Sequence, residues 1–283
     1  MDSEYRGYLL MHRDVPVAHL TLDGATGSIV TVGELLNTAH LPVGVPVCRG
    51  KIDRTALNLW WSSRAIPSSR ARLWPLMEEL PAVTPQQLPE KSLGLSLSDA
   101  YWIRPSDASL YWAEVNFHET PFPGDVGILL FGGHVTGPIR LLSPDNTCDG
   151  HLQKKWTIQN GKRCLIKSGS GALRQEAYNE VIASRVMERL NIPHVPYNLQ
   201  MVDGLPFSVC EDFVAEDTEY VSAWYLMHTK TKHNHISLYQ HYLERCSALG
   251  IPGAERAIAQ QIVVDSLLLN EDRHQGNFGA VRR

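Results

Sequence analysis

The sequence has little of what marks secreted, zinc-binding or membrane proteins. Its five cysteines stand far apart and form no CxxC pair, which argues against a disulfide framework and against a zinc site. No window approaches the ~18 consecutive apolar residues of a membrane-spanning helix. The N-terminal region mixes charges with short apolar runs, unlike a secretory signal. We therefore expect a soluble, cytoplasmic protein without membrane contact.

An excess of positive charge is absent as well. The chain has 26 Lys and Arg against 30 Asp and Glu, a formal net charge of -4. Nucleic-acid-binding domains carry a basic surface, so this balance argues against direct contact with DNA or RNA. Hydrophobic residues make up 43% and charged residues 20% of the 283 residues, as in ordinary globular proteins of one large or two modest domains.

The first half of the chain predicts a β-rich module. Apolar alternation and turn residues predict strands over 7–32, and an amphipathic helix is expected over 52–64 with Asp53 as its N-cap. The prolines of 65–92 indicate a loop with one short helix, and 93–133 reads as short strands with aromatic-rich turns. The residues expected on or near the apolar face of the helix are Leu57, Leu59, Trp60 and Trp61.

A second pattern begins near residue 141. Two short strands, 155–159 and 163–167, flank Asn160-Gly161, the strongest short signal for a hairpin. Apolar residues at steps of three and four then predict a helix over 175–190 with one buried face. Further predicted elements are strands at 198–203 and 207–213 and helices at 221–229, 238–249 and 254–269. The expected buried face of the first helix consists of Tyr178, Val181, Ile182, Val186 and Leu190.

The segment NEDRHQGNFG, residues 270–279, carries the sharpest chemical signal. Asp272 and Asn277 are five residues apart, the spacing that protein kinases use between the catalytic aspartate and a metal-binding asparagine. A strongly apolar helix precedes this segment, and we expect its burial to fix the loop. Gly276 is expected to let the backbone turn back so that both side chains face one point.

This segment resembles the catalytic loop of HipA-like kinases, and its DRHxxN core is similar to that of phosphoinositide kinases. The resemblance extends over roughly 141–279. It implies that Asp272 orients the acceptor hydroxyl and that Asn277 binds Mg²⁺. His274 supports the loop in the HipA-like interpretation and lies beside the reacting hydroxyl in the lipid-kinase-like one.

The resemblance also implies a nucleotide site upstream of that loop. Lys167 resembles the lysine that binds ATP phosphates, and Glu180 its pairing glutamate, with Glu176 one helical turn earlier as the competitor. Glu211 and Phe213 lie in a hinge whose backbone would hold adenine. The loop 145–155 matches less well because Gly150 is its one glycine, so backbone amides around 147–151 would contact phosphate, with added charge from the lysines at 154 and 155.

The expected fold class is therefore α+β, with a small β-rich domain followed by a bilobal, protein-kinase-like domain. The expected divisions are a HipA N-terminal-like module at 1–140, a small lobe at 141–213 and the start of a helical large lobe at 214–283. Only four residues follow the catalytic segment, so the metal-binding aspartate of a DFG-like element is missing. A truncated product, a second polypeptide that completes the site, and nucleotide binding without turnover all stay open.

The function these residues predict is transfer of the γ-phosphate of ATP, with Mg²⁺, to a serine or threonine of a protein. A lipid substrate is less favoured because no basic cluster lies near the loop. The alternative from a different class is a nucleotide-binding regulatory module without catalysis. This module would be a pseudokinase or a partner of a helix-turn-helix regulator, as in a toxin–antitoxin pair.

Overall fold

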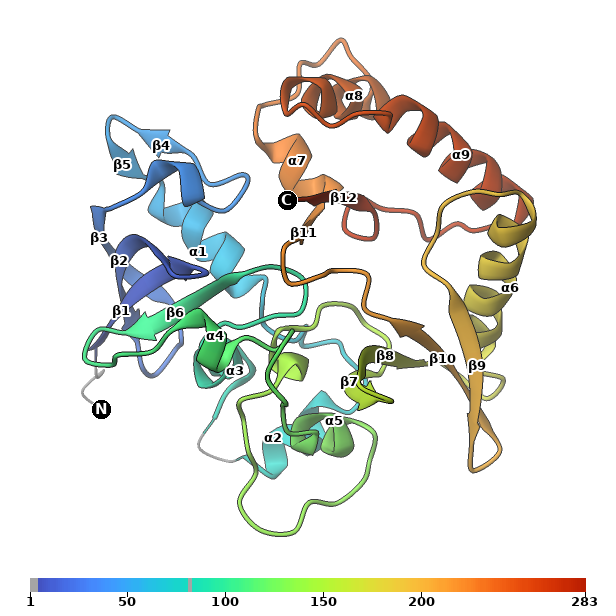
Figure 1. Ribbon diagram of the computed structural model, residues 1–283, viewed down its shortest axis with the longest axis horizontal. Coiled ribbons are helices and arrows are strands. Elements are labelled where there is room, and N and C mark those ends of the chain that lie inside the picture. Colours follow the sequence, from blue (N-terminus) through green and yellow to red (C-terminus); the bar gives the residue numbers. More distant parts are fainter. Residues whose placement is uncertain (1–4, 81–82) are drawn as a thin grey trace.

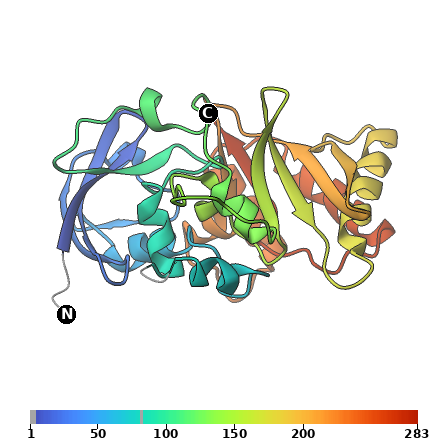
Figure 2. The same ribbon diagram turned by 90° about the horizontal axis from the view of Figure 1, so that it is seen from below.

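A four-stranded antiparallel sheet forms one end of the molecule in the computed structural model, which describes residues 5–80 and 83–283 (Figures 1 and 2). The strand order is β3-β2-β1-β6. The strands predicted over 7–32 are confirmed, with tight turns after His12 and Asp23. The strands are β1 (Tyr5–His12), β2 (Val15–Asp23), β3 (Ile29–Leu35) and β6 (Tyr101–Pro105). Two more residue pairs, β4 (Val47–Cys48) and β5 (Lys51–Ile52), form a small hairpin beside it.

Helix α1 (Arg54–Ser62) covers this sheet. The Asp53 side chain accepts a hydrogen bond from the Ala56 amide at 3.0 Å, so the predicted N-cap is confirmed. Leu57 and both tryptophans of the helix are buried, but Leu59 is 53% exposed. The expectation for Leu59 was wrong because a helix turns about 100° per residue, which places position 59 away from the stripe that starts at 57.

The region 65–133 is more helical than expected. The short helix in the proline-rich loop is confirmed, although residues 81–82 of that loop lie outside the described part of the chain. The region 93–133, predicted as strands, has one described strand, β6, and two helices. The run DVGILL is helical because so short an apolar run fits either state until tertiary contacts decide. The helices are α2 (Leu73–Glu78), α3 (Leu88–Lys91), α4 (Trp112–Val115) and α5 (Asp125–Leu130), with 3-10 turns at Thr38–His40, Pro85–Gln87 and Pro144–Thr147.

A second antiparallel sheet, of order β7-β8-β10-β9, lies toward the other end of the molecule in both views (Figures 1 and 2). The predicted hairpin is confirmed, and both of its turn residues adopt positive φ, 51° at Asn160 and 80° at Gly161, as a two-residue hairpin turn requires. The strands are β7 (Lys154–Gln159), β8 (Lys162–Ser168), β9 (Tyr197–Val202) and β10 (Leu205–Glu211).

Helix α6 (Gln175–Arg189) packs against this sheet with a different face from the one predicted. Ala177 and Ser184 are buried, whereas Tyr178 and Ile182 are 40% and 53% exposed. The prediction failed because the contact with the sheet is made largely through polar side chains, which a hydrophobic periodicity does not detect. The Ser184 hydroxyl, for instance, accepts a hydrogen bond from the Tyr197 amide at 3.0 Å.

Three helices and a short ribbon follow. Helix α9 begins at the predicted residue and ends two residues before the predicted end. Val264 is buried, but Ile262, Val263 and Leu267 are 52–64% exposed, so the expectation of a buried helix holds for one side only. A strand pair that was not predicted, β11 with β12, brings the segment after residue 278 back against residues 219–222. The elements are α7 (Ala223–His228), α8 (Leu238–Ala248), α9 (Ala254–Leu267), β11 (Glu219–Ser222) and β12 (Gly279–Arg282). In the described residues, no helix is long and apolar enough to cross a membrane.

A buried polar cluster connects the ribbon to the first sheet. Glu219 of β11 lies 2.5 Å from His12 Nε2 of β1 and 2.6 Å from Arg282 Nη2 of β12. Arg282 also donates to the Tyr101 hydroxyl of β6 at 3.0 Å. Burial alone would raise the pKa of Glu219, but the His12 ring and the Arg282 guanidinium outweigh it and lower that pKa to about 2.

This cluster predicts how stability depends on pH. A carboxyl whose pKa is lowered by folding stabilises the protein above its ordinary pKa, here 4.5, and this contribution is lost as the pH falls toward the folded value. We expect Glu219→Gln to lower the free energy of unfolding by about 3 kcal/mol at pH 7. The difference from the wild type should shrink between pH 4.5 and about 2, as measured by denaturant titration. The exposed Glu188, in an ion pair with Arg185, is the control, and Glu188→Gln should change little. A difference that is the same at pH 7 and pH 2 would contradict the assigned role of Glu219.

Candidate functional site

The candidate site centres on a lysine of the second sheet. Lys167 Nζ on β8 lies 2.8 Å from Glu180 Oε1 on α6 and 2.7 Å from the Tyr197 hydroxyl on β9. The ammonium group also lies 4.8 Å from the centre of the Tyr197 ring. Ser208 on β10 donates to the other oxygen of Glu180. Four elements thus each contribute one side chain to this polar group.

The fold distinguishes the two candidate partners of Lys167. Glu180 faces the sheet and holds the lysine, whereas Glu176 accepts hydrogen bonds from the amide and hydroxyl of Ser170, in the turn before α6. Glu176 also lies at the first turn of the helix, where a carboxylate interacts favourably with the free amides. The geometry therefore assigns the pairing to Glu180 and a local capping contact to Glu176.

The lysine stays charged in this environment. Burial favours its neutral form, but the Tyr197 hydroxyl and the Glu180 carboxylate outweigh that effect and raise the pKa of Lys167 above its ordinary value. The side chains of Lys167 and Glu180 are 18% and 28% exposed, so the pair is shielded but still open on one side. Such a cation can bind an anionic group that approaches from solvent.

A second lysine stands directly opposite the first. Lys154 of β7 pairs in register with Lys167. In the neighbouring pair, the backbone amide of Ser168 donates to the Gln153 carbonyl at 2.8 Å. Because hydrogen-bonded pairs alternate along an antiparallel ladder, the two lysines form the non-bonded pair, in which side chains are closest. Lys155 lies on the other face, where its ammonium sits 4.6 Å from the centre of the Phe131 ring. Of the two lysines considered from sequence, only Lys154 lies beside Lys167.

The loop before β7 is held differently from what the sequence indicated. Thr147 is buried and donates to the Leu95 carbonyl at 2.6 Å, which ties the beginning of the loop to the first half of the chain. Gly150 has φ 102°, a conformation in which residues with a Cβ are strained. Because Thr147 is buried, its amide is not available to a phosphate. Of the predicted range 147–151, the part around Gly150 is the one that could contact phosphate.

The catalytic-type segment is a tightly tied loop between α9 and β12. Arg273 donates two hydrogen bonds to Asp265 of α9, at 2.7 and 2.8 Å. The Asn277 side chain donates to the Asp272 carbonyl and accepts from the His274 amide at 3.2 Å. Asp272 and His274 themselves are exposed. Exposed side chains on a fixed backbone suit residues that meet a ligand.

Two further contacts, with helices α7 and α8, fix the same loop. The carbonyl of Phe278 accepts from the Ala223 amide at 2.8 Å, and its ring packs edge-on against Tyr242. Gly276 does not adopt the positive φ that a special turn would need. A Cβ at this position would lie 3.0 Å from the exposed His274 ring, which would have to move slightly. The backbone nevertheless turns back at residues 275–276, as expected, and the Asn277 amide donates to the His274 carbonyl at 3.1 Å.

The predicted hinge lies at the end of β10. The Glu211 side chain forms an exposed ion pair with Lys162 at 2.7 Å, and Phe213 is 52% exposed, with its ring edge-on to Tyr220. Between them, the Asp212 amide donates to the Arg163 carbonyl at 2.8 Å. Burial raises the pKa of Asp212 to about 7. The side chains at 211 and 213 are exposed, and the use of their backbone to contact a base stays a prediction.

The candidate residues thus form two groups. Lys167 and Glu180 are joined to each other, as are Asp272 and Asn277, but no hydrogen bond or ion pair within the described chain links the first group to the second. The sequence did not predict that Tyr197 and Ser208 belong to the first group, because no motif surrounds either residue. Alternation along β10, which aligns Ser208 with Lys167, could have indicated the serine.

The second group fits Mg²⁺ only in part. Mg²⁺ takes six oxygen ligands and uses one or two protein side chains beside phosphate and water. Asp272 and Asn277 offer one carboxylate and one amide oxygen. The amide oxygen also lies 3.4 Å from Arg273 Nη1, so a metal would need that guanidinium to turn away. The described residues contain no cluster of three His, Cys, Asp or Glu arranged to hold a metal.

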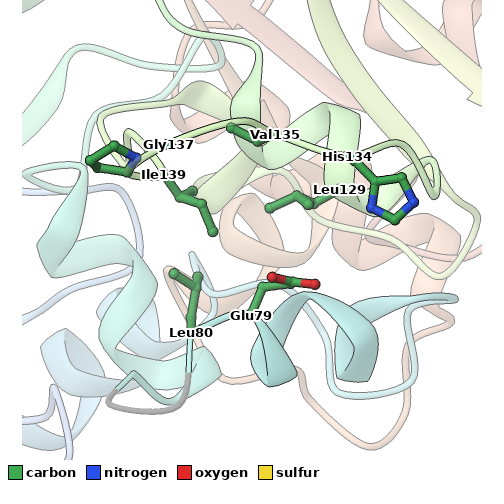
Figure 3. Close-up of a pocket in the computed structure, with 8 residues that line it drawn as sticks. Glu79, Leu80, Leu129, His134, Val135, Gly137 and Ile139 are labelled. Atoms are coloured by element: carbon green, nitrogen blue, oxygen red, sulfur yellow. The ribbon is translucent and has the colours of Figure 1, made fainter.

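A cavity of about 310 Å³ lies elsewhere, between α2, α5 and the loop that follows α5 (Figure 3). Leu80, Leu129 and Val135 supply apolar surface, and Glu79 and His134 are its polar side chains. No residue of either candidate group lines this cavity. The cavity therefore does not change the assignment of the site, which rests on the polar groups described above.

Comparisons with known proteins add little. No protein-family model matches the sequence, and no curated protein matches it. The crystal structure of the Helicobacter pylori proinflammatory kinase CtkA is similar to this structure, with 20% sequence identity and a TM-score of 0.38. The match covers 46% of this chain and 48% of that one, so the chain spans about half of that protein. A likeness at that TM-score does not indicate a function for this chain.

The bidentate contact between Arg273 and Asp265 is expected to limit the motion of the loop at 270–279. We expect Arg273→Gln to speed hydrogen exchange at the amides of 272–277 by about tenfold, because a bidentate pair contributes about 1–2 kcal/mol to local order. Exchange in the β7–β8 hairpin should not change. Arg185→Gln removes an exposed ion pair on α6 and serves as control. Unchanged exchange at 272–277 in Arg273→Gln would show that the loop does not depend on this contact.

Proposed function

We propose that the protein binds a nucleoside triphosphate and transfers its terminal phosphate. The observation that supports this best is the shielded pair of Lys167 and Glu180, which joins a strand to a helix and leaves the ammonium group open on one side. A lysine so held can neutralise α- and β-phosphates, as the resemblance to HipA-like kinases implies. In this proposal 141–213 acts as the nucleotide-binding lobe and 214–283 begins the lobe that carries the acceptor site.

The loop around Gly150 and the opposed lysine complete the proposed phosphate site. Lys154 adds a second positive charge next to Lys167. Two like charges at close cross-strand positions repel each other, and a polyphosphate between them would remove that repulsion. The backbone of Glu211 and Phe213, at the end of β10, is proposed to contact adenine. ATP is thus the ligand that this arrangement fits best.

In the proposed reaction, the Asp272 carboxylate accepts the proton of the acceptor hydroxyl and orients it toward the phosphate. Asn277 supplies an oxygen to Mg²⁺, which when bound shares the charge of the transferred group. His274 packs over Gly276 and supports the loop. The proposed acceptor is a serine or threonine of a protein, as in HipA-like kinases, with a helix-turn-helix antitoxin-like protein as the proposed partner in the cytoplasm.

One observation favours a second candidate, a nucleotide-binding module without catalysis. Arg273 holds a positive charge 3.4 Å from the oxygen of Asn277, the position where a metal ion would bind. A cation there competes with Mg²⁺. If this arrangement persists when nucleotide binds, the protein retains ATP affinity through Lys167 but does not transfer phosphate.

Nucleotide binding is the first test. We expect Mg·ATP to raise the melting temperature of the 283-residue chain, because a ligand of the folded state stabilises it by about 2.7 kcal/mol at a hundredfold excess over its dissociation constant. Lys167→Met should remove most of that rise. Lys155→Met, on the opposite face of the sheet, is the matched control and should keep it. An equal rise in the two variants would remove Lys167 from the site.

Catalysis is the second test, in a form of the protein that transfers phosphate. Asp272→Asn should lower the rate by orders of magnitude and leave the dissociation constant of ATP nearly unchanged, because the carboxylate faces the acceptor. Asn277→Ala should lower the rate and weaken its dependence on Mg²⁺. His274→Ala should have a milder effect, whereas a lipid-kinase-like mechanism predicts a loss as large as in Asp272→Asn. An Asp272→Asn protein with the wild-type rate would refute the assignment, and binding without transfer in the wild type would support the non-catalytic alternative.

A further inference from the structure

An arginine far from the predicted site holds the loop around Gly150. Arg70, in the segment between α1 and α2, donates its Nε to the Gly150 carbonyl at 2.9 Å and its Nη2 to the Cys148 carbonyl. The residue is only 2% exposed. Its third nitrogen, Nη1, is buried and has no hydrogen-bond partner in the part of the chain that the structure describes.

This arginine also lacks a counter-ion. Arg64, a comparable residue at 8% exposure, binds the Gly94 carbonyl and forms an ion pair with Asp99 at 2.7 Å. Within residues 5–80 and 83–283, Arg70 has no carboxylate at ion-pair distance. Asp145 is near enough to be influenced by its charge but binds the Trp156 amide instead, and burial raises the pKa of Asp145 to about 6. An unbalanced buried charge is costly, so an anion from outside would be favoured here.

The hydrogen bonds of the loop show which way its backbone faces. The carbonyls of Cys148 and Gly150 point to Arg70, and that of His151 accepts from the Ala71 amide at 3.4 Å. The Gly150 amide donates to Asp149 Oδ1 at 2.6 Å, whereas the amides of residues 149, 151 and 152 have no acceptor among the described residues. A loop whose carbonyls turn inward and whose amides stay free presents donors to an anion.

The charges around this loop add to the same preference. The Lys154 ammonium lies over Gly150, so close that a Cβ on the glycine would collide with it. Burial lowers the pKa of Lys154, and the neighbouring charges of Arg70 and Lys167 lower it further. Lys167 has Glu180 as its counter-ion, whereas Lys154 and Arg70 have none at ion-pair distance in the described chain. Asp149, in the same loop, acts on the pKa of Lys154 in the opposite direction but forms no ion pair with it among the described residues.

We propose that Arg70 is a positioning residue of the phosphate site. It holds the carbonyls of Cys148 and Gly150 inward so that the free amides of residues 149, 151 and 152 and the ammonium of Lys154 meet the polyphosphate end of a nucleotide. The first half of the chain thereby takes part in ligand binding through this arginine. This inference rests on the proposed nucleotide site at Lys167 and adds to it a role for a segment about 80 residues away along the chain.

The test compares ligands that differ only in phosphate. Dissociation constants of Mg·ATP, ADP, AMP and adenosine are measured by calorimetry for wild type, Arg70→Gln and Arg70→Lys. We expect Arg70→Gln to weaken ATP binding about 10- to 100-fold, the size of lost charge-assisted hydrogen bonds, and to change adenosine binding less than about twofold. Arg70→Lys should recover part of the affinity for ATP. Inorganic tripolyphosphate, as a probe without a base, should raise the melting temperature of the wild type and not that of Arg70→Gln.

Arg64→Gln is the matched control, because it removes another buried arginine that binds a loop carbonyl. It should lower stability and leave the ratio of ATP to adenosine affinity unchanged. If Arg70→Gln keeps the wild-type ratio, the role of Arg70 is overturned while the nucleotide site stands. If the wild type binds neither ATP nor tripolyphosphate, the proposed function fails as well. A response of the wild type to tripolyphosphate alone, lost in Arg70→Gln, would keep the anion site and reject the nucleotide.

Discussion

The second half of the structure depends on the contact between Lys167 and Glu180. Both side chains are largely withdrawn from water, at 18% and 28% exposure, and a charge in such a place is tolerated only with a partner. Tyr197 and Ser208 satisfy the remaining hydrogen-bonding atoms of the pair. Strands β8, β9 and β10 and helix α6 therefore converge on one polar point, and the face of the sheet that carries it differs from the apolar face against Phe131.

Charged side chains have ionic partners at some places in the described structure and lack them at others. Glu219 and Asp265 each have a cationic partner, and so has the exposed Glu211. Beside Lys167, by contrast, Lys154 and Arg70 lack counter-ions among the described residues. A ligand that supplies negative charge would stabilise these cations, which favours a polyphosphate at the loop around Gly150.

The two candidate groups are fixed by separate anchors. The lysine group is held within the second sheet, whereas the loop at 270–279 is tied to α9 through Asp265 and to the start of α7 through the Phe278 carbonyl. No direct hydrogen bond or ion pair between the groups was found in the described residues, so their relative position is set by the fold that connects them. A ligand bound to both groups would add the missing link between them.

Local features were determined by the sequence alone. The Asn160-Gly161 turn, the cap at Asp53 and the ends of most helices depend on residues within one turn or hairpin, where conformational preference acts directly. The sequence also showed the five-residue spacing of Asp272 and Asn277 in the loop at 270–279. Tertiary structure alone decided which face of α6 is buried, that one side of α9 stays exposed, and that Arg70 reaches Gly150. The reason is that periodicity shows which residues share a face but not what that face meets, and polar contacts between segments about 80 residues apart leave no local pattern.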